Sequence, residues 1–178
     1  RKRAGGSATQ ISTSKGHVTK KNKIPVLKGT ENVPTKGKVS GTTDKGDEEL
    51  TAKNIILETG ARARELTGLE ADSDRVWAYK DALVPKHMPK KLLVIGSGAI
   101  GIEFASFYNT LGADTTVVEV MDRILPVEDE EISAFAKKSF EKQGMKTMQK
   151  AHVHHLDRGK TSGPAHIAVG GRLERHQY

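Results

Sequence analysis

The residues best suited to chemistry lie in one glycine-rich turn. It reads Gly96-Ser97-Gly98-Ala99-Ile100-Gly101 and directly follows the apolar run Lys91 to Ile95. In such a G-x-G-x-x-G motif the first glycine permits a tight turn, the second lets a pyrophosphate approach the backbone, and the third lets helix and strand pack closely. The N-terminus of the following helix offers free N–H groups and a positive dipole end to phosphates. The motif therefore predicts a dinucleotide site.

An acidic residue stands at the spacing that such a site requires. Glu119 lies 18 residues after Gly101 and belongs to a second β-branched run, Thr115 to Val120. An acid at the end of this strand hydrogen-bonds the adenosine ribose and repels a 2′-phosphate, so NAD is favoured over NADP. Arg123 weakens this preference without reversing it. The alternative is a glycine-rich turn that binds no ligand.

The elements around the motif predict an α/β fold. Strand, helix and strand follow one another from residue 91 to residue 120, as a right-handed parallel crossover requires. Gly112 is placed to end the helix. The spacing predicts that the buried stripe of the helix consists of Ile100, Phe104, Tyr108 and Leu111.

A second helix and further strands are expected after this crossover. Residues 128–143 have helical spacing, and 145–148 would form a third strand. The predicted buried stripe of this second helix is Ile132, Phe135, Ala136 and Phe140. The remaining runs, 151–156, 164–169 and 172–178, predict a β-meander with a turn at Gly170-Gly171.

The N-terminal half has weaker patterns. Residues 1–20 show no hydrophobic period and are predicted to be disordered or poorly packed. Short extended pieces at 24–27, 38–42 and 52–58 predict a small antiparallel meander that ends in a buried strand. Pro85 and Pro89 interrupt any helix there, so a linker and a domain boundary are expected near residue 88. The expected divisions are 1–20, 21–88 and 89–178.

Composition excludes several classes of function. The chain has no cysteine, so it has neither a disulfide nor a thiolate for catalysis or metal binding. A net charge of +7 would permit contact with nucleic acid, but 22 acidic residues and only 4% aromatic residues disfavour a nucleic-acid-binding module. No apolar run is long enough to span a membrane, and a cytoplasmic location is expected.

Two pairs of side chains could indicate a metal site or a cofactor-stacking site. His152 and His154 would share one face of a strand, but without a third ligand a solvated strand is favoured and no metal site is predicted. Trp77 and Tyr79 would suit a cofactor-stacking pair, yet packing under the linker is favoured because aromatic side chains bury large areas.

Residues 53–149 resemble the dihydrolipoyl dehydrogenases of the flavoprotein pyridine nucleotide-disulfide oxidoreductase family. The resemblance rests on Lys53 to Leu57, Thr59 to Arg62, Leu92 to Tyr108 and Val117 to Val120. It implies a Rossmann-type NAD-binding domain over 89–178, incomplete at its C-terminus, and a FAD-binding-domain remnant with linker over 21–88. In that family electrons pass from dihydrolipoamide to a redox disulfide, then to FAD, and finally to NAD.

The resemblance also implies site residues and partners. Gly96, Ser97, Gly98, Ala99, Ile100 and Gly101 would surround the pyrophosphate, Glu119 the ribose, Glu103 the nicotinamide side, Ala151 the adenine through its backbone, and Thr59 and Gly60 the flavin. The parent would be a homodimer that serves the lipoyl-bearing acyltransferase of a 2-oxo acid dehydrogenase complex. Another FAD- and NAD(P)H-dependent disulfide reductase, or a transhydrogenase, is the alternative.

The chain departs from the family pattern in ways that limit the prediction. It has no first G-x-G-x-x-G for FAD, no C-x-x-x-x-C disulfide and no dimer domain with its His-Glu pair. No residue is therefore predicted to be catalytic, and the chain alone is expected to be inactive. Glu58 stands where a small residue is expected beside the flavin, and Thr67 stands in place of a proline. Without the strand that would flank 91–95, marginal stability or aggregation is expected.

Overall fold

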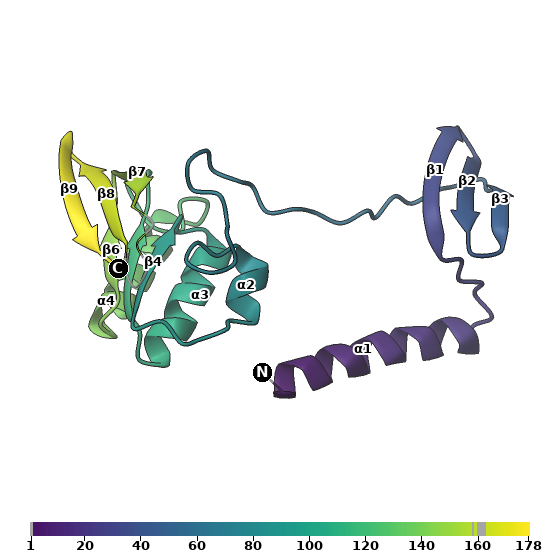
Figure 1. Ribbon diagram of the computed structural model, residues 1–178, viewed down its shortest axis with the longest axis horizontal. Helices are drawn as coiled ribbons and strands as arrows, with labels where there is room; N and C mark the ends of the chain where they lie inside the picture. The colour runs from purple at the N-terminus through teal and green to yellow at the C-terminus, as the bar shows by residue number, and fades with distance from the viewer. Residues whose placement is uncertain (1, 158, 160–162) are drawn as a thin grey trace. The chain divides into compact units, whose positions relative to one another are not determined.

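The computed structural model describes residues 2–157, 159 and 163–178. Contacts divide the chain into two compact units, Arg1–Ala61 and Arg62–Tyr178 (Figure 1). The second unit holds the glycine-rich turn. Its fold is a mixed α/β arrangement with one parallel and one antiparallel sheet.

The first unit consists of one helix and one small sheet. Helix α1 spans Lys2–Lys21. Strands β1 (Gly29–Thr35), β2 (Lys38–Thr43) and β3 (Gly46–Thr51) pair antiparallel in that order. An antiparallel meander was predicted here, and the expected run 38–42 is β2.

Two of the three predicted strands in this unit are wrong. Residues 24–27 and 52–58 have no strand structure, and the expected buried strand is instead exposed, with Ile56 91% accessible. Apolar, β-branched sequence favours an extended backbone, but a strand also needs a neighbouring strand for its hydrogen bonds. In the described part of the chain no strand pairs with 52–58, and the Ala52 N–H donates to the Gly37 carbonyl only at the end of β3.

Residues 1–20 were predicted to be disordered or poorly packed, and from residue 2 onward they form the helix α1. Hydroxyls of Thr9, Thr13 and Ser14 donate hydrogen bonds to carbonyls four residues earlier. A helix satisfies its backbone within its own segment, so it needs no hydrophobic period. Residues 5–18 are nevertheless all exposed, which agrees with the poor packing that was predicted.

The second unit is built around a parallel sheet with strand order β4-β5-β6. Strands β4 (Lys91–Ile95), β5 (Asp114–Val118) and β6 (Lys146–Met148) alternate with helices α3 (Ala99–Thr110) and α4 (Glu130–Lys142). This order confirms the predicted crossover. β5 ends at Val118, two residues before the predicted end at Val120, so Glu119 comes directly after the strand.

An antiparallel sheet completes the second unit. Strands β7 (Ala151–Leu156), β8 (Pro164–Val169) and β9 (Arg172–Gln177) form the predicted meander. Gly170 and Gly171 join β8 to β9 with φ values of 56° and 82°. A two-residue hairpin turn with both φ values positive suits glycine, because its backbone twist matches that of the strands.

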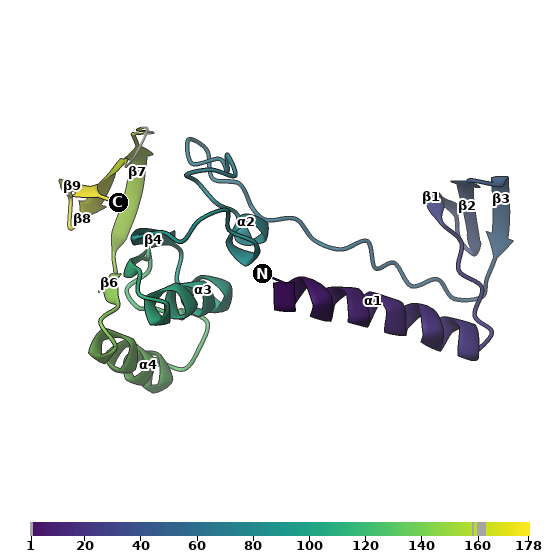
Figure 2. The same ribbon diagram turned by 60° about the horizontal axis from the view of Figure 1, so that its bottom comes forward.

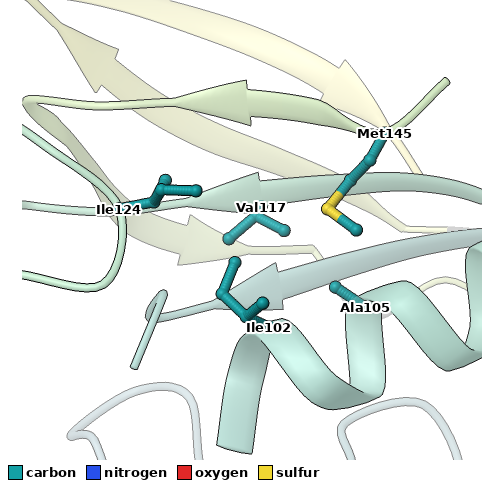
Figure 3. Packing of buried hydrophobic residues seen from close by; sticks show 5 residues of the cluster. All are labelled: Ile102, Ala105, Val117, Ile124 and Met145. Carbon is teal, nitrogen blue, oxygen red and sulfur yellow. The ribbon is translucent and has the colours of Figure 1, made fainter. Parts of the chain in front are cut away.

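The core of the second unit lies on both faces of β5. Val117 packs with Ile102 and Ala105 of α3 and with Met145 (Figure 3). Val118 packs with Val153 and other residues of the antiparallel sheet. Since successive side chains of a strand point to opposite faces, β5 separates two layers. Figure 2 shows α3 and α4 on one side of the parallel strands and β7–β9 on the other.

Both predicted helix stripes are correct only in part: Tyr108 is buried and Phe140 packs against the core, as predicted. On α3 the buried residues are Ile102, Ala105 and Tyr108, while the predicted Ile100 and Leu111 are exposed. On α4 the buried residue is Ser133, and the predicted Ile132 and Phe135 are exposed. Apolar residues occur on several faces of these helices, so spacing alone does not select the face that meets the sheet.

Residues 62–88 pack with the second unit, so the compact units divide at residue 61 rather than near 88. The Tyr108 hydroxyl donates to the Ala82 carbonyl at 2.7 Å, within the short helix α2 (Tyr79–Leu83) that the sequence did not suggest. The ring centroids of Trp77 and His87 lie 5.9 Å apart, so Trp77 packs against the linker as predicted, whereas Tyr79 is exposed. No helix in the described part of the chain is long and apolar enough to cross a membrane.

Candidate dinucleotide-binding site

The glycine-rich turn reverses the chain between β4 and α3. Gly96 has a φ of 97°, a conformation that favours glycine, and its N–H donates to the Val118 carbonyl at 2.8 Å. Gly98 is the N-cap of α3 and has no side chain to cap the helix. Gly98, Ala99 and Ile100 are exposed. The first turn of α3 thus presents backbone to a ligand rather than to a capping side chain.

Gly98 and Gly101 serve two different purposes. A Cβ atom at Gly101 would collide with the backbone carbonyl of Gly96, so the helix approaches the turn too closely for any other residue. A Cβ atom at Gly98 would meet no atom within 4 Å. The open space above Gly98 is where a pyrophosphate would reach the backbone, and the residues present therefore fit this group.

Glu119 is held at the turn by several hydrogen bonds. Its side chain is buried, and the residue is only 6% exposed. Oε2 accepts from the Ser97 N–H at 2.8 Å and from the Ser97 hydroxyl at 2.6 Å. Oε1 accepts from the Met121 N–H at 2.9 Å. The structure thus brings together the motif and the acid that spacing had paired.

These contacts keep the Glu119 carboxyl ionised. Burial raises the pKa of Glu119, because a charged group loses hydration. Hydrogen bonds from the Ser97 hydroxyl and from the N–H groups of Met121, Ser97 and Val120 lower it by more. The net pKa lies below the ordinary value, so the site presents a negative charge to an incoming nucleotide.

Ala151 adjoins Glu119 through the backbone. The Ala151 N–H donates to the Glu119 carbonyl at 2.9 Å, and the Glu119 N–H donates to the Met148 carbonyl at 2.8 Å. Ala151 is itself buried. The end of β5 is therefore fixed between β6 and the start of β7, and the predicted adenine-side residue lies beside the predicted ribose-side residue.

In the described part of the chain, no side-chain hydrogen bond joins the remaining predicted site residues to the glycine-rich turn or to Glu119. Glu103 is an exposed residue of α3. Thr59 and Gly60 are exposed in the first compact unit, on a segment without regular structure. The described residues thus fit NAD better than FAD, for which they supply an exposed segment that carries the Glu58 carboxylate.

Sequence reasoning missed the loop that supports the turn. The Leu125 N–H donates to the Ser97 carbonyl at 3.0 Å, and the Leu125 carbonyl accepts from the Ser133 hydroxyl at 3.0 Å. Leu125 has a φ of 49°. Leucine rarely adopts this left-handed conformation, so the sequence does not indicate a turn there. Ser133 is buried on α4, but its position in the sequence does not indicate this contact.

Arg123 and the histidines have other surroundings. An Nη atom of Arg123 donates to the Pro126 carbonyl at 3.3 Å. His152 and His154 lie on one face with ring centroids 4.9 Å apart, as strand alternation predicts. In the described ranges no three His, Asp or Glu residues are grouped to hold a metal ion.

The fold and this turn define a nucleotide-binding class of protein. The family model described as pyridine nucleotide-disulphide oxidoreductase matches residues 2–172, and the chain belongs to this family.

Similar proteins are named more specifically. The chain is 43% identical to a dihydrolipoyl dehydrogenase of Rhizobium etli, over 97% of the chain and 39% of that protein. It is 40% identical to one of Zymomonas mobilis, over 96% of the chain and 37% of that protein. The chain thus spans about two-fifths of the length of these relatives.

Solved structures agree with the fold. LpdA from Mycobacterium tuberculosis superposes with a TM-score of 0.69 at 26% identity, over 84% of this chain and 34% of that one. The flavoprotein disulfide reductase RclA from Escherichia coli has a TM-score of 0.71 at 21% identity, over 90% of this chain and 37% of that one, and supports the fold alone.

Proposed function

We propose that this chain binds NAD at residues 96–101, with Glu119 as the acceptor for the adenosine ribose hydroxyls. The observation that carries the proposal is the buried Glu119 carboxylate, hydrogen-bonded to the motif turn at the end of β5. An ionised acid at this point accepts hydrogen bonds from a ribose diol and repels a 2′-phosphate. The proposed ligand is therefore NAD rather than NADP.

The other groups bind and orient the nucleotide. Backbone N–H groups at the start of α3 hold the pyrophosphate, and the motif residues Gly96, Ser97, Gly98, Ala99, Ile100 and Gly101 surround it. Glu103 lies one turn further along α3, toward the nicotinamide, and the Ala151 backbone lies toward the adenine. When bound, NAD supplies a nicotinamide ring that accepts hydride.

In domain terms, 89–178 is proposed to be a Rossmann-type NAD-binding domain and 21–88 a C-terminal part of a FAD-binding domain with its linker. Thr59 and Gly60 would then face FAD in a longer parent. The named relatives support a dihydrolipoyl dehydrogenase as that parent, which oxidises dihydrolipoamide through a disulfide and FAD. With no cysteine in the chain, its own residues bind nucleotide and do not carry the disulfide step.

The proposed parent is a cytoplasmic homodimer that serves the lipoyl-bearing acyltransferase of a 2-oxo acid dehydrogenase complex. This proposal follows from the similarity to dihydrolipoyl dehydrogenases.

Calorimetric titration of the 178-residue chain with NAD and NADP tests the binding function directly. We expect saturable one-to-one binding of NAD and weaker binding of NADP. Equal affinity for both nucleotides would contradict the assigned role of Glu119, and the lack of any NAD binding would overturn the site. An intact mass and an absorbance spectrum of the same sample establish that neither FAD nor a longer chain contributes.

A further inference from the structure

Ser97 donates two hydrogen bonds to the same carboxylate oxygen of Glu119. They reach Oε2 from the Ser97 N–H at 2.8 Å and from the Ser97 hydroxyl at 2.6 Å. Oε1 accepts from the Met121 N–H. Ser97 is fully buried, so water does not replace its hydroxyl.

The Glu119 carboxylate is therefore held by several donors. The Ser97 N–H and hydroxyl donate to Oε2, the Met121 N–H donates to Oε1, and the Val120 N–H also hydrogen-bonds the carboxylate. Of these donors only the Ser97 hydroxyl belongs to a side chain, so this bond alone depends on the residue type at its position.

We propose that Ser97 is a positioning residue for nucleotide recognition: its hydroxyl fixes the orientation of the Glu119 carboxylate toward the adenosine ribose. This inference rests on the proposed function. It goes further because the G-x-G-x-x-G motif leaves this position open to any residue. Any residue except proline supplies the N–H, but the second bond to Oε2 requires a side-chain donor such as a hydroxyl.

Loss of the hydroxyl has a defined consequence. In Ser97→Ala the carboxylate keeps the bonds from the backbone N–H groups but loses its shortest one, from the Ser97 hydroxyl. A carboxylate that is no longer held must be ordered by the ligand, which weakens binding. NAD affinity should fall about three- to tenfold, in line with one charge-assisted hydrogen bond. NADP makes no ribose 2′-hydroxyl contact, so its affinity should change less and the preference for NAD should narrow.

The same hydroxyl affects the acid itself. The Ser97 side chain is the leading hydrogen-bond cause that lowers the pKa of Glu119. Its removal should move the titration of Glu119 to higher pH. A general loosening of the fold would not shift this one carboxyl selectively.

The experiment compares the full chain with Ser97→Ala and Ser97→Gly, and with Thr115→Val as a matched control. Thr115 is also fully buried on β5, and its hydroxyl donates to the Ala113 carbonyl at 3.2 Å, away from Glu119. Calorimetry measures NAD and NADP affinity. Carbon-13 NMR follows the Glu119 carboxyl during a pH titration, with Glu119→Gln to assign its signal. Circular dichroism establishes that each variant is folded.

We expect both Ser97 variants to bind NAD more weakly and to titrate Glu119 at higher pH, while Thr115→Val does neither. In a Glu119→Gln background, Ser97→Ala should have little further effect on NAD affinity, because it acts through the carboxylate. Unchanged affinity and titration in folded Ser97 variants would overturn the inference and leave the proposed function standing. An equal loss in Thr115→Val would also overturn it. Failure of the parent chain to bind NAD would overturn both.

Discussion

Two glycines of one motif illustrate how residue type and residue role differ. Gly101 is required by the carbonyl that a side chain would strike, whereas Gly98 faces open space. Glycine at position 101 is required for packing within the protein, whereas glycine at position 98 leaves space for the ligand. Substitutions at the two positions should therefore separate stability from binding.

Gly98→Val should abolish NAD binding while the chain remains folded, because its side chain would occupy the approach to the backbone and its Cβ atom would meet no protein atom within 4 Å. Gly101→Ala should instead destabilise the chain by about 1–3 kcal/mol, as overpacking does. Urea unfolding and NAD titration of both variants check this. If Gly98→Val binds NAD like the parent, the pyrophosphate has been assigned to the wrong backbone.

Glu119→Ala should weaken NAD binding about tenfold or more and relax the discrimination against NADP. The substitution removes the ribose acceptor and the charge that repels a 2′-phosphate. The ratio of the two dissociation constants, measured by calorimetry, is the decisive quantity. A ratio equal to that of the parent would exclude Glu119 as the specificity residue.

Glu119 also contributes a pH-dependent part of the stability. Its pKa is lowered in the folded chain, so this contribution is present above the unfolded value of about 4.3 and is lost as pH falls through the folded value. Glu119→Gln should be less stable than the parent at pH 7, and the difference should shrink as the solution is acidified below that unfolded value. Urea unfolding at several pH values tests this, with the exposed Glu103→Gln as control. A stability difference between Glu119→Gln and the parent that does not depend on pH would contradict the lowered pKa of Glu119.

At the scale of elements, β5 connects the motif to the core. Its register with β4 places Ile95 beside Val118, so the turn after β4 and Glu119 after β5 emerge at the same edge. Parallel strands bring their carboxyl ends together, and ligands bind at that edge. The antiparallel sheet adds a second layer through Val118.

Val117→Ala and Val118→Ala should each destabilise the second unit by about 1–3 kcal/mol, through lost burial and a small cavity. Their local effects should differ. Val117→Ala should accelerate amide hydrogen exchange in α3, and Val118→Ala should do so in β7 and β8, because each side chain packs against that layer. Identical exchange patterns in the two variants would contradict the separation into two layers.

At the scale of the whole chain, the two compact units differ in how much they bury. The residues that form the hydrophobic clusters all lie in the second unit. In the first unit, α1 and the segment after β3 leave apolar side chains exposed, Ile11 and Ile56 among them. The second unit is therefore expected to be the more stable part.

Limited trypsin digestion should cut first in the exposed segment 52–64, at Lys53, Arg62 or Arg64, or within α1. A C-terminal product that begins near residue 63 or 65 should accumulate and retain NAD binding. Mass spectrometry of the time course identifies the sites. Early cleavage within 91–156 would show that the second unit is not the stable one.

The sequence by itself determined the glycine turn, the acid that follows the next strand, the parallel crossover and the C-terminal meander. These features depend on local conformational limits, such as glycine at positive φ, and on short-range periodicity, so few residues specify them. Only the tertiary structure decided which face of α3 is buried and that 52–58 has no strand partner. It also decided that the Ser97 hydroxyl donates a hydrogen bond to Glu119, 22 residues away in the sequence. Each of these depends on contacts between segments distant in sequence, which no local pattern encodes.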